Sequence, residues 1–241
     1  VLTDFLSWGI ENYVAANMGI IFWNHGGGSV SGVCFDELNE NDSLSLEEID
    51  TSLTSVYDKM TDKFAFIGFD ACLMATVETA NMLAPHADYM FASEETEPGY
   101  GWDYTEIAGF LESNPTADTA ELGKTVADSF MASCEAVGAG SEATLSVTDL
   151  SRVDELIKAV NDAAEEMYKN SDEPALLAEA VRNIYNVRAY GSNNDTEGYT
   201  NMVDLGSMIS AAVPGEKADK VMSALEKAVV YNIYGSDKDG S

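Results

Sequence analysis

Basic residues are scarce in this chain of 241 residues, in which 12 Lys and Arg stand against 42 Asp and Glu and give a formal net charge of −30. An acidic surface of this kind repels phosphates, so we expect no nucleic-acid partner. Cationic peptides and divalent cations fit it better. Long apolar runs are also missing: no stretch approaches the roughly 20 apolar residues of a membrane-spanning helix, and we expect no membrane span.

Cysteine is rare as well, and the three that occur, Cys34, Cys72 and Cys134, form no C-x-x-C pair. Their wide spacing argues against a disulfide framework and against a zinc cluster. An odd number leaves at least one thiol unpaired, so a reactive cysteine is worth seeking. Cys34 is expected in a loop and Cys134 on a helix.

Hydrophobic residues make up 46% of the chain, which is enough for a large core. Four short apolar runs are bounded by glycines and polar turns, a pattern typical of buried parallel strands. The expected strands are Met18–Trp23, Phe64–Phe69, Asp88–Ala92 and Ala143–Thr148.

Helical patterns fill the gaps between these strands. Ser45 and Glu48 form a capping-box pattern before a periodic segment that reaches about Met60. The other expected helices are Leu73–Ala84, Thr119–Val137, Arg152–Lys169, Pro174–Val187, Met202–Val213 and Lys217–Ile233. The alternation predicts an α/β fold with a mostly parallel sheet at residues 1–150, followed by a mainly helical region at 151–241 that packs on or continues the same domain. Residues 191–198 are expected to form a loop.

Two of the expected strands end at side chains that can react. His25 follows the first strand and Cys72 follows the second. Ligands of parallel α/β sheets bind beyond the carboxyl ends of the strands. If the two strands are neighbours, the imidazole and the thiol face one crevice, and together they make a Cys–His nucleophilic site.

The surroundings of both residues support this interpretation. Cys72 is expected at the first turn of the helix Leu73–Ala84, where the helix dipole favours a thiolate. Gly26 to Gly28 allow close approach of a substrate, and the N–H groups of Gly26 and Cys72 can bind an oxyanion. A lone cysteine is usually a core residue and a glycine run is usually a turn. The hypothesis of a Cys–His site rests on finding both segments at the ends of two strands.

Three segments of the chain resemble the clostripain family of cysteine peptidases, within the caspase-like superfamily. They are Trp23–Gly28 (W-N-H-G-G-G), Gly68–Met74 (G-F-D-A-C-L-M) and Ala92–Trp102 (A-S-E-E-T-E-P-G-Y-G-W). Gly198–Leu205 is similar to a downstream segment of that family. The resemblance implies a caspase-like α/β/α sandwich whose catalytic domain occupies residues 1–150. It also implies a cysteine endopeptidase with Cys72 and His25 as its dyad and a thioester acyl-enzyme.

The resemblance further implies cleavage after Arg or Lys, with Asp70 lining the specificity pocket. A carboxylate in a walled pocket does select a cation, although Asp70 can equally be a turn or helix-cap residue. Glu95 and Trp102 belong to the loop after the third strand, which is expected to form another wall of the pocket. Glu94 and Glu97 in the same loop can add to the preference, and the sequence does not rank these acids.

Cofactors and location follow from the same resemblance. It implies no required cofactor and no metal ligands, but it allows a bound Ca²⁺ because some relatives use calcium. Since the chain begins with Val, a signal segment can have been removed. We expect a secreted or cell-surface bacterial protein that acts on peptides or proteins with basic residues. Family members usually open with a strand and a helix before the segment where this chain starts, so we expect the sheet to lack a strand.

Two other functions deserve comparison. An esterase or lipase also uses His-Gly-Gly-Gly, but it needs a G-x-S-x-G elbow that is missing here, and the only other histidine is His86. The second alternative is a non-catalytic, calcium-binding surface or adhesion module derived from a peptidase. The segment Asp36–Asp50 is acidic, but it lacks the spacing of an EF-hand. The intact His25 and Cys72 argue against this alternative.

Overall fold

The computed structural model describes residues 1–184, 187–191, 193–194, 198–199, 202–213 and 215–238. The chain forms two compact units, Val1–Leu150 together with Val230–Gly240, and Ser151–Val229. None of the helices in the described part is long and apolar enough to cross a membrane.

The first unit contains six helices and seven strands among its described residues. The helices are α1 (Leu2–Asn12), α2 (Gly28–Ser31), α3 (Leu46–Val56), α4 (Val77–Leu83), α5 (Tyr104–Ser113) and α6 (Thr119–Ala136). The strands are β1 (Gly19–Trp23), β2 (Val33–Asp36), β3 (Asp42–Leu44), β4 (Phe64–Asp70), β5 (Ala87–Ala92), β6 (Thr144–Asp149) and β11 (Val229–Tyr234).

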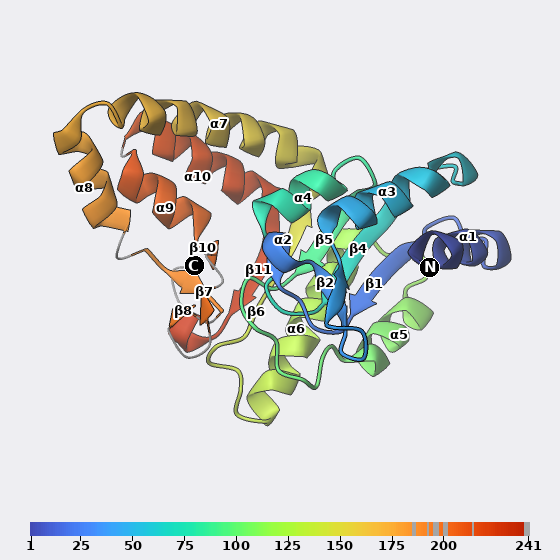
Figure 1. Cartoon of the computed structure of the whole chain (residues 1–241). Helices are drawn as coiled ribbons and strands as arrows, with labels where there is room; N and C mark the ends of the chain where they lie inside the picture. Colours follow the sequence, from blue (N-terminus) through green and yellow to red (C-terminus); the bar gives the residue numbers. More distant parts are fainter. Residues whose placement is uncertain (185–186, 192, 195–197, 200–201, 214, 239–241) are drawn as a thin grey trace. The chain divides into compact units, whose positions relative to one another are not determined.

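A five-stranded sheet in the order β1-β4-β5-β6-β11 forms the centre of this unit. Helices α3 and α4 lie on one face of the sheet and α5 and α6 on the other, which makes an α/β/α sandwich (Figure 1). The β1–β4 and β4–β5 pairs are parallel, as the sequence predicts. The β6 strand is antiparallel to β5, so the prediction of a fourth parallel strand was wrong. Two helices, α5 and α6, connect β5 to β6, and the second reverses the direction of the chain.

Both faces of β4 are buried because helices cover both sides of the sheet. Phe66 stacks on Phe91 of β5, with ring centroids 4.7 Å apart. Phe69 stacks on Phe22 of β1 at 5.3 Å. Phe66 and Phe69 are an odd number of residues apart, so they point to opposite faces. Such pairs contribute about 0.5–1.5 kcal/mol beyond the burial of their area, and they fix the three parallel strands side by side.

Two helix boundaries in this unit show where local pattern succeeds and where it fails. Ser45 and Glu48 form the expected capping box at the start of α3. The predicted helix Leu73–Ala84 is wrong at its start, because α4 begins at Val77 behind the N-cap Thr76. Leu73 has a φ of +66°, in the left-handed region, and it interrupts the helix that its neighbours would otherwise continue.

The second unit is mainly helical in its described residues. It contains α7 (Val153–Asn170), α8 (Pro174–Ile184), α9 (Leu205–Ala212) and α10 (Glu216–Ala228), with the short strands β7 (Ala189–Tyr190), β8 (Asn193–Asn194), β9 (Gly198–Tyr199) and β10 (Met202–Val203). Lys227 Nζ lies 2.6 Å from Glu155 Oε1, and Lys217 Nζ donates to the carbonyl of Asp162 at 2.9 Å. These contacts tie α10 to α7.

Two predicted helices in this region need correction. The helix expected at Lys217–Ile233 ends at Ala228, and the chain continues as β11, whose V-V-Y-N-I-Y sequence alternates in exposure. β-Branched and aromatic residues favour the strand. The helix expected at Met202–Val213 begins only at Leu205, where the Asp204 side chain caps it. Residues 185–186 of the helix expected at Pro174–Val187, and residues 192 and 195–197 of the expected loop, lie outside the described residues.

Candidate active site

The parallel pairing of β1 and β4 brings the two chemically reactive segments to one edge of the sheet. Trp23 lies opposite Asp70 in the register, and the N–H of Asn24 donates to the carbonyl of Asp70 at 3.4 Å. Gly26 packs so closely on the main chain of Cys72 that a Cβ at this position would collide with the carbonyl of Cys72. The residues after each strand therefore lie side by side, and glycine is required at position 26 for this approach.

His25 is held by the hairpin of β2 and β3. Its carbonyl accepts a hydrogen bond from Cys34 N–H at 3.0 Å, and its N–H donates to the Asn24 side chain at 2.6 Å. The imidazole Nε2 lies 3.2 Å from Glu37 Oε1, and both side chains are exposed. Since Glu37 occupies Nε2, Nδ1 is the ring nitrogen left for other partners. The sequence offered no local signal for Glu37, because only the folded hairpin brings it back to His25.

Cys72 is half-buried, and its sulfur is surrounded by main-chain groups. Glu97 N–H donates to Sγ at 3.2 Å, and Sγ lies 3.8 Å from the Glu97 carbonyl. Burial raises the pKa of the Cys72 thiol, and the N–H groups of Glu97 and Gly26 oppose that rise. In the part of the chain that the structure describes, no hydrogen bond joins the imidazole of His25 to Sγ.

The expected help from a helix dipole was wrong. The α4 helix begins at Val77, so Cys72 lies in the turn before it rather than in its first turn. That turn is attached to the loop after β5: Leu73 N–H donates to the Glu95 carbonyl at 3.1 Å and Ala75 N–H to the Ser93 carbonyl at 2.9 Å. A thiolate at Cys72 would therefore depend on hydrogen-bond donors such as the Glu97 N–H rather than on a helix terminus.

Asp70 is buried, with 3% of its surface exposed. Its Oδ2 accepts hydrogen bonds from Trp102 N–H at 3.2 Å and from the Tyr104 hydroxyl at 2.8 Å. Gly101 has a φ of +67°, and a Cβ there would lie 2.8 Å from each carboxylate oxygen. Asp70 thus binds the end of the loop after β5 to the start of α5. Its role as a pocket residue stays a prediction.

Glu97 has the most unusual environment in this loop. Both of its carboxylate oxygens are buried without a hydrogen-bond partner, and the same holds for Trp102 Nε1. Burial raises the pKa of Glu97 well above its usual range, and the nearby charge of Asp70 raises it further. The sequence showed Glu97 only as one of several acids in the loop, because burial of one acid among them is not visible in the pattern.

The other two predicted substrate-binding residues are packed inside the structure. Glu95 is buried, and its Oε1 accepts a hydrogen bond from Thr96 N–H at 2.9 Å. Trp102 is 3% exposed, and its ring lies against Gly68 of β4, where any Cβ would crowd it. Both residues shape the loop that adjoins Cys72. Direct contact with a substrate stays a prediction for both.

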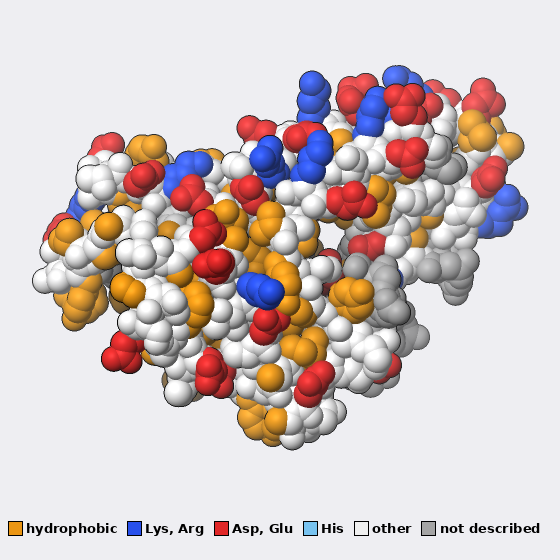
Figure 2. Space-filling model, turned by 180° about the vertical axis from the view of Figure 1, so that it is seen from behind, with side chains coloured by type: hydrophobic (Ala, Val, Ile, Leu, Met, Phe, Trp, Pro, Cys, Tyr) orange, Lys and Arg blue, Asp and Glu red, His pale blue; other side chains and the backbone are white. Residues whose placement is uncertain are grey.

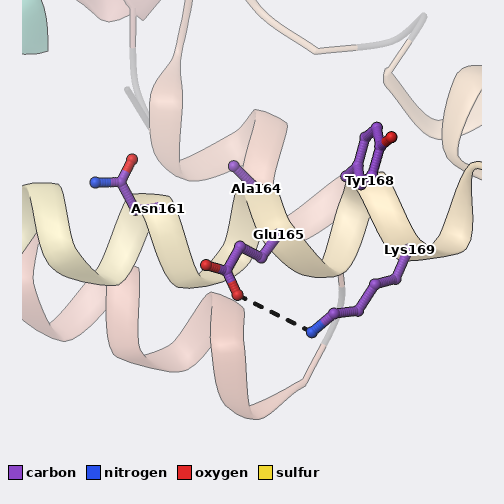
Figure 3. A pocket seen from close by; sticks show the side chains of 5 residues that line it. All are labelled: Asn161, Ala164, Glu165, Tyr168 and Lys169. Atoms are coloured by element: carbon purple, nitrogen blue, oxygen red, sulfur yellow. Dashed lines mark ion pairs between the residues drawn. The ribbon is translucent and has the colours of Figure 1, made fainter.

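Other features lie away from this edge of the sheet. The hollow in Figure 3 follows a single helix, α7, and is lined by Asn161, Ala164, Glu165, Tyr168 and Lys169. Cys34, expected in a loop, lies in β2, where its φ is +62°. Among the described residues, which include the acidic segment Asp36–Asp50, no three His, Cys, Asp or Glu side chains are grouped to hold a metal ion.

Comparison with known proteins gives matches of sequence and fold. Clostripain from Hathewaya histolytica is 32% identical over 125 residues, which cover 44% of this chain and 23% of that protein. A secreted C11 cysteine protease from Bacteroides thetaiotaomicron, solved in complex with an irreversible peptide inhibitor, has a TM-score of 0.73 at 20% identity, over 97% of this chain and 62% of that one. An inactive zymogen C11 protease from Parabacteroides distasonis has a TM-score of 0.73 at 19% identity, over 97% and 60%.

These matches confirm the expected caspase-like fold, because the architecture of the C11 proteases extends over nearly all of this chain. The match is partial in the other direction: the chain spans less than a quarter of the curated relative and less than two thirds of the two solved proteins. The model of the clostripain family matches residues 1–241, so the chain belongs to the clostripain family.

Proposed function

We propose that this chain carries the catalytic machinery of a cysteine endopeptidase, with Cys72 as nucleophile and His25 as its acid–base partner. The observation that carries the proposal is the packing of Gly26 on the main chain of Cys72 at the carboxyl ends of two parallel strands. This packing places the segment of His25 beside the thiol and aims an N–H toward Sγ. Membership in the clostripain family supports the same chemistry.

The proposed reaction is acyl transfer through a thioester. His25 takes the thiol proton, and the thiolate of Cys72 attacks the carbonyl carbon of the scissile peptide bond. The N–H groups of Gly26 and Cys72 receive the developing oxyanion. The C–N bond then breaks as His25 returns the proton to the leaving amine. Water, deprotonated by His25, hydrolyses the thioester and releases the acid product and the free thiol.

A thiol-reactive peptide probe with a basic residue next to its reactive group tests this mechanism. We expect the probe to modify Cys72 in the native protein, with slow modification in a His25→Ala variant and none in Cys72→Ala. Peptide mapping by mass spectrometry identifies the modified residue. Modification of Cys34 or Cys134 instead would contradict the proposal, and a folded protein without any modification would favour the non-catalytic module.

The proposed substrates are peptides or proteins cleaved after Arg or Lys. Asp70 lies two residues before the nucleophile, and its buried carboxylate is close to the side chain of Glu97. A guanidinium or ammonium group of a substrate would form charge-assisted hydrogen bonds with the carboxylate of Asp70. The resemblance of Gly68–Met74 to the family motif supports the same preference.

Asp70→Asn and Tyr104→Phe form a matched pair for this proposal. Tyr104→Phe removes the hydrogen bond from the Tyr104 hydroxyl to Asp70 and keeps the charge, whereas Asp70→Asn weakens that hydrogen bond and removes the charge. If Asp70 selects the cation, Asp70→Asn lowers kcat/KM for Arg substrates by about tens to a thousandfold and changes norleucine substrates much less. If Asp70 only holds the loop, both variants lower kcat/KM equally for Arg and norleucine substrates, and both reduce the melting temperature.

Location and cofactors complete the proposal. We propose that the protein is bacterial and acts in a secreted or surface-bound form, as the description of the Bacteroides thetaiotaomicron neighbour as secreted suggests. The reaction drawn above uses a thiol, an imidazole and backbone N–H groups, and we propose that it requires no cofactor. Ca²⁺ would act on stability rather than on chemistry. Measurements of activity and melting temperature with EDTA and with added Ca²⁺ separate these roles.

A further inference from the structure

The loop of residues 93–102 contacts the nucleophile through Glu97. Its N–H donates to Cys72 Sγ, and its carbonyl lies 3.8 Å from the same sulfur. Both ends of the loop are attached elsewhere: Ser93 Oγ interacts with Thr144 Oγ1 at 2.8 Å, and Trp102 N–H donates to Asp70 at 3.2 Å. Between these two attachments, the position of the Glu97 main chain therefore depends on where the Glu97 side chain lies.

That side chain points into the protein. Both carboxylate oxygens are buried and lack a hydrogen-bond partner, close to the carboxylate of Asp70 and to Trp102 Nε1, which is also unpartnered. A negative charge on Glu97 would also raise the pKa of the Tyr104 hydroxyl and of the Cys72 and Cys134 thiols. Among the described residues, no Lys or Arg side chain forms an ion pair with Asp70 or Glu97.

The surroundings of the two carboxyl groups differ. Asp70 accepts hydrogen bonds from two donors, Trp102 N–H and the Tyr104 hydroxyl. Glu97 is buried beside the carboxylate of Asp70, and both the burial and the neighbouring negative charge favour the neutral form of Glu97, whereas the nearby Trp102 indole opposes this effect more weakly. Glu97 is therefore the member of the pair that holds a proton.

We propose that Glu97 is a positioning residue that works as a neutral acid, holding its own N–H against the sulfur of Cys72. In the neutral form, the side chain stays buried beside Asp70 and the N–H stabilises the thiolate. In the ionised form, repulsion from Asp70 and the cost of a buried charge displace the side chain, and the N–H moves away from Sγ. A charged Glu97 also opposes formation of a second anion at Cys72.

The test compares Glu97→Gln, which is always neutral and nearly isosteric, with Glu97→Ala, which removes the side chain. Glu112→Gln is the matched control, because Glu112 is an exposed acid of α5 that contacts none of these groups. The rate of Cys72 alkylation by iodoacetamide is measured from pH 6 to pH 9 by peptide mapping, which separates Cys72 from Cys34 and Cys134. Steady-state kcat and KM are measured over the same range.

We expect Glu97→Gln to match the wild type at pH 6 and to exceed it by about threefold or more at pH 9, in alkylation rate and in kcat, with KM unchanged. Glu97→Ala should lose about tenfold in kcat at every pH, because nothing anchors the loop. Glu112→Gln should follow the wild type. Equal, pH-independent losses in the Gln and Ala variants would overturn the proposal, and so would a rise in KM confined to cationic substrates.

Thermal stability gives a second readout that needs no turnover, so it distinguishes this proposal from failure of the proposed function. A carboxyl group whose pKa is raised in the folded protein stabilises the fold most below its unfolded pKa and loses that contribution as the pH rises toward its folded pKa. Glu97→Gln lacks this dependence. The melting temperature of Glu97→Gln relative to the wild type should therefore increase from pH 5 to pH 8, and a constant difference would refute the neutral form of Glu97.

Discussion

The two units of the molecule carry very different charge. Residues 1–150 and 230–240 contain 28 Asp and Glu and 4 Lys and Arg, whereas residues 151–229 contain 14 and 8. On the face drawn in Figure 2, most of the Lys and Arg side chains lie over the helices of the second unit. Solubility alone would not require such an asymmetry. The excess of acid is concentrated in the unit that holds His25 and Cys72.

The charged side chains also differ in their surroundings between the two units. In the second unit, bases meet acids on exposed helices, as in Lys220–Glu216 at 2.8 Å and Lys227–Glu155 at 2.6 Å. Exposed pairs of this kind contribute little to stability, because water and salt screen them. In the first unit, Asp70 and Glu97 are both buried. Asp70 accepts a hydrogen bond from Tyr104, and burial raises the pKa of Glu97 so that its protonated form is favoured. The comparison predicts that substitution of acids near Cys72 changes reactivity more than substitution of acids in the second unit.

Loss of the nucleophile should have the largest effect. We expect Cys72→Ala to lower kcat/KM by about a thousandfold or more, because the variant lacks the proposed nucleophile. The fold should persist, with an unchanged far-UV circular dichroism spectrum. Cys34→Ala and Cys134→Ala are the controls and should keep most of the activity. Substantial turnover by Cys72→Ala would remove the functional difference between the two units.

The two histidines provide the next contrast. His25→Ala should reduce kcat by about a hundred- to ten-thousandfold, since the imidazole transfers the proton in both steps. His86 is buried, and its Nε2 lies 2.7 Å from Asp50 Oδ1. His86→Ala should therefore keep its turnover but lose about 1–3 kcal/mol of unfolding free energy. Urea denaturation and initial rates measured on the same samples separate these effects. A larger loss of activity in His86→Ala than in His25→Ala would contradict the assignment of His25.

Glu37 should have an intermediate effect through the orientation of His25. We expect Glu37→Ala to lower kcat by about three- to tenfold with little change in KM, because an exposed contact restrains the ring only moderately. Glu37→Gln keeps a hydrogen-bond acceptor and should restore most of the loss. Glu40→Gln is the control, an exposed acid of the same hairpin. Equal losses in the Ala and Gln variants would mean that Glu37 acts by its charge rather than by orienting the ring.

The sequence predicted the fold well where local pattern and packing agree. The three parallel strands β1, β4 and β5 were predicted because each is a short apolar run bounded by glycines or polar turns. The direction of β6 was missed together with α5, whose apolar periodicity is weak. The strand β11 was taken as the end of a helix, because an alternating run of six residues directly follows helical periodicity. Chain direction depends on the number of intervening elements, and local pattern does not show that number.

The predicted site residues divide in the same way. The sequence placed His25 and Cys72 at strand ends, and the register of β1 and β4 sets their segments side by side. It could not show that Leu73 adopts a left-handed φ, which moves the start of α4 away from Cys72. Nor could it show which acid of residues 93–102 is buried. Burial and backbone conformation at these residues depend on contacts with Asp70, Gly101 and Trp102, which only the folded chain brings together.

The smallest expected effect concerns long-range attraction of substrates, and it follows from the charge difference between the units. An acidic surface raises the association rate of cationic peptides, and salt screens that attraction over a Debye length of about 10 Å at 0.1 M. We therefore expect kcat/KM for a peptide with several basic residues to fall about two- to fivefold between low salt and about 0.5 M NaCl, with little change for a neutral peptide.

Two triple variants locate the source of this attraction. One neutralises exposed acids of the first unit and the other neutralises exposed acids of the second, each by substitution with the corresponding amide. The first set is Glu106, Glu112 and Glu121, and the second is Asp172, Glu173 and Glu179. If attraction depends on the charge of the unit that holds the site, the first variant loses more of the salt dependence than the second. Equal losses would mean that net charge alone guides the substrate, and then the asymmetry between the units would have no kinetic role.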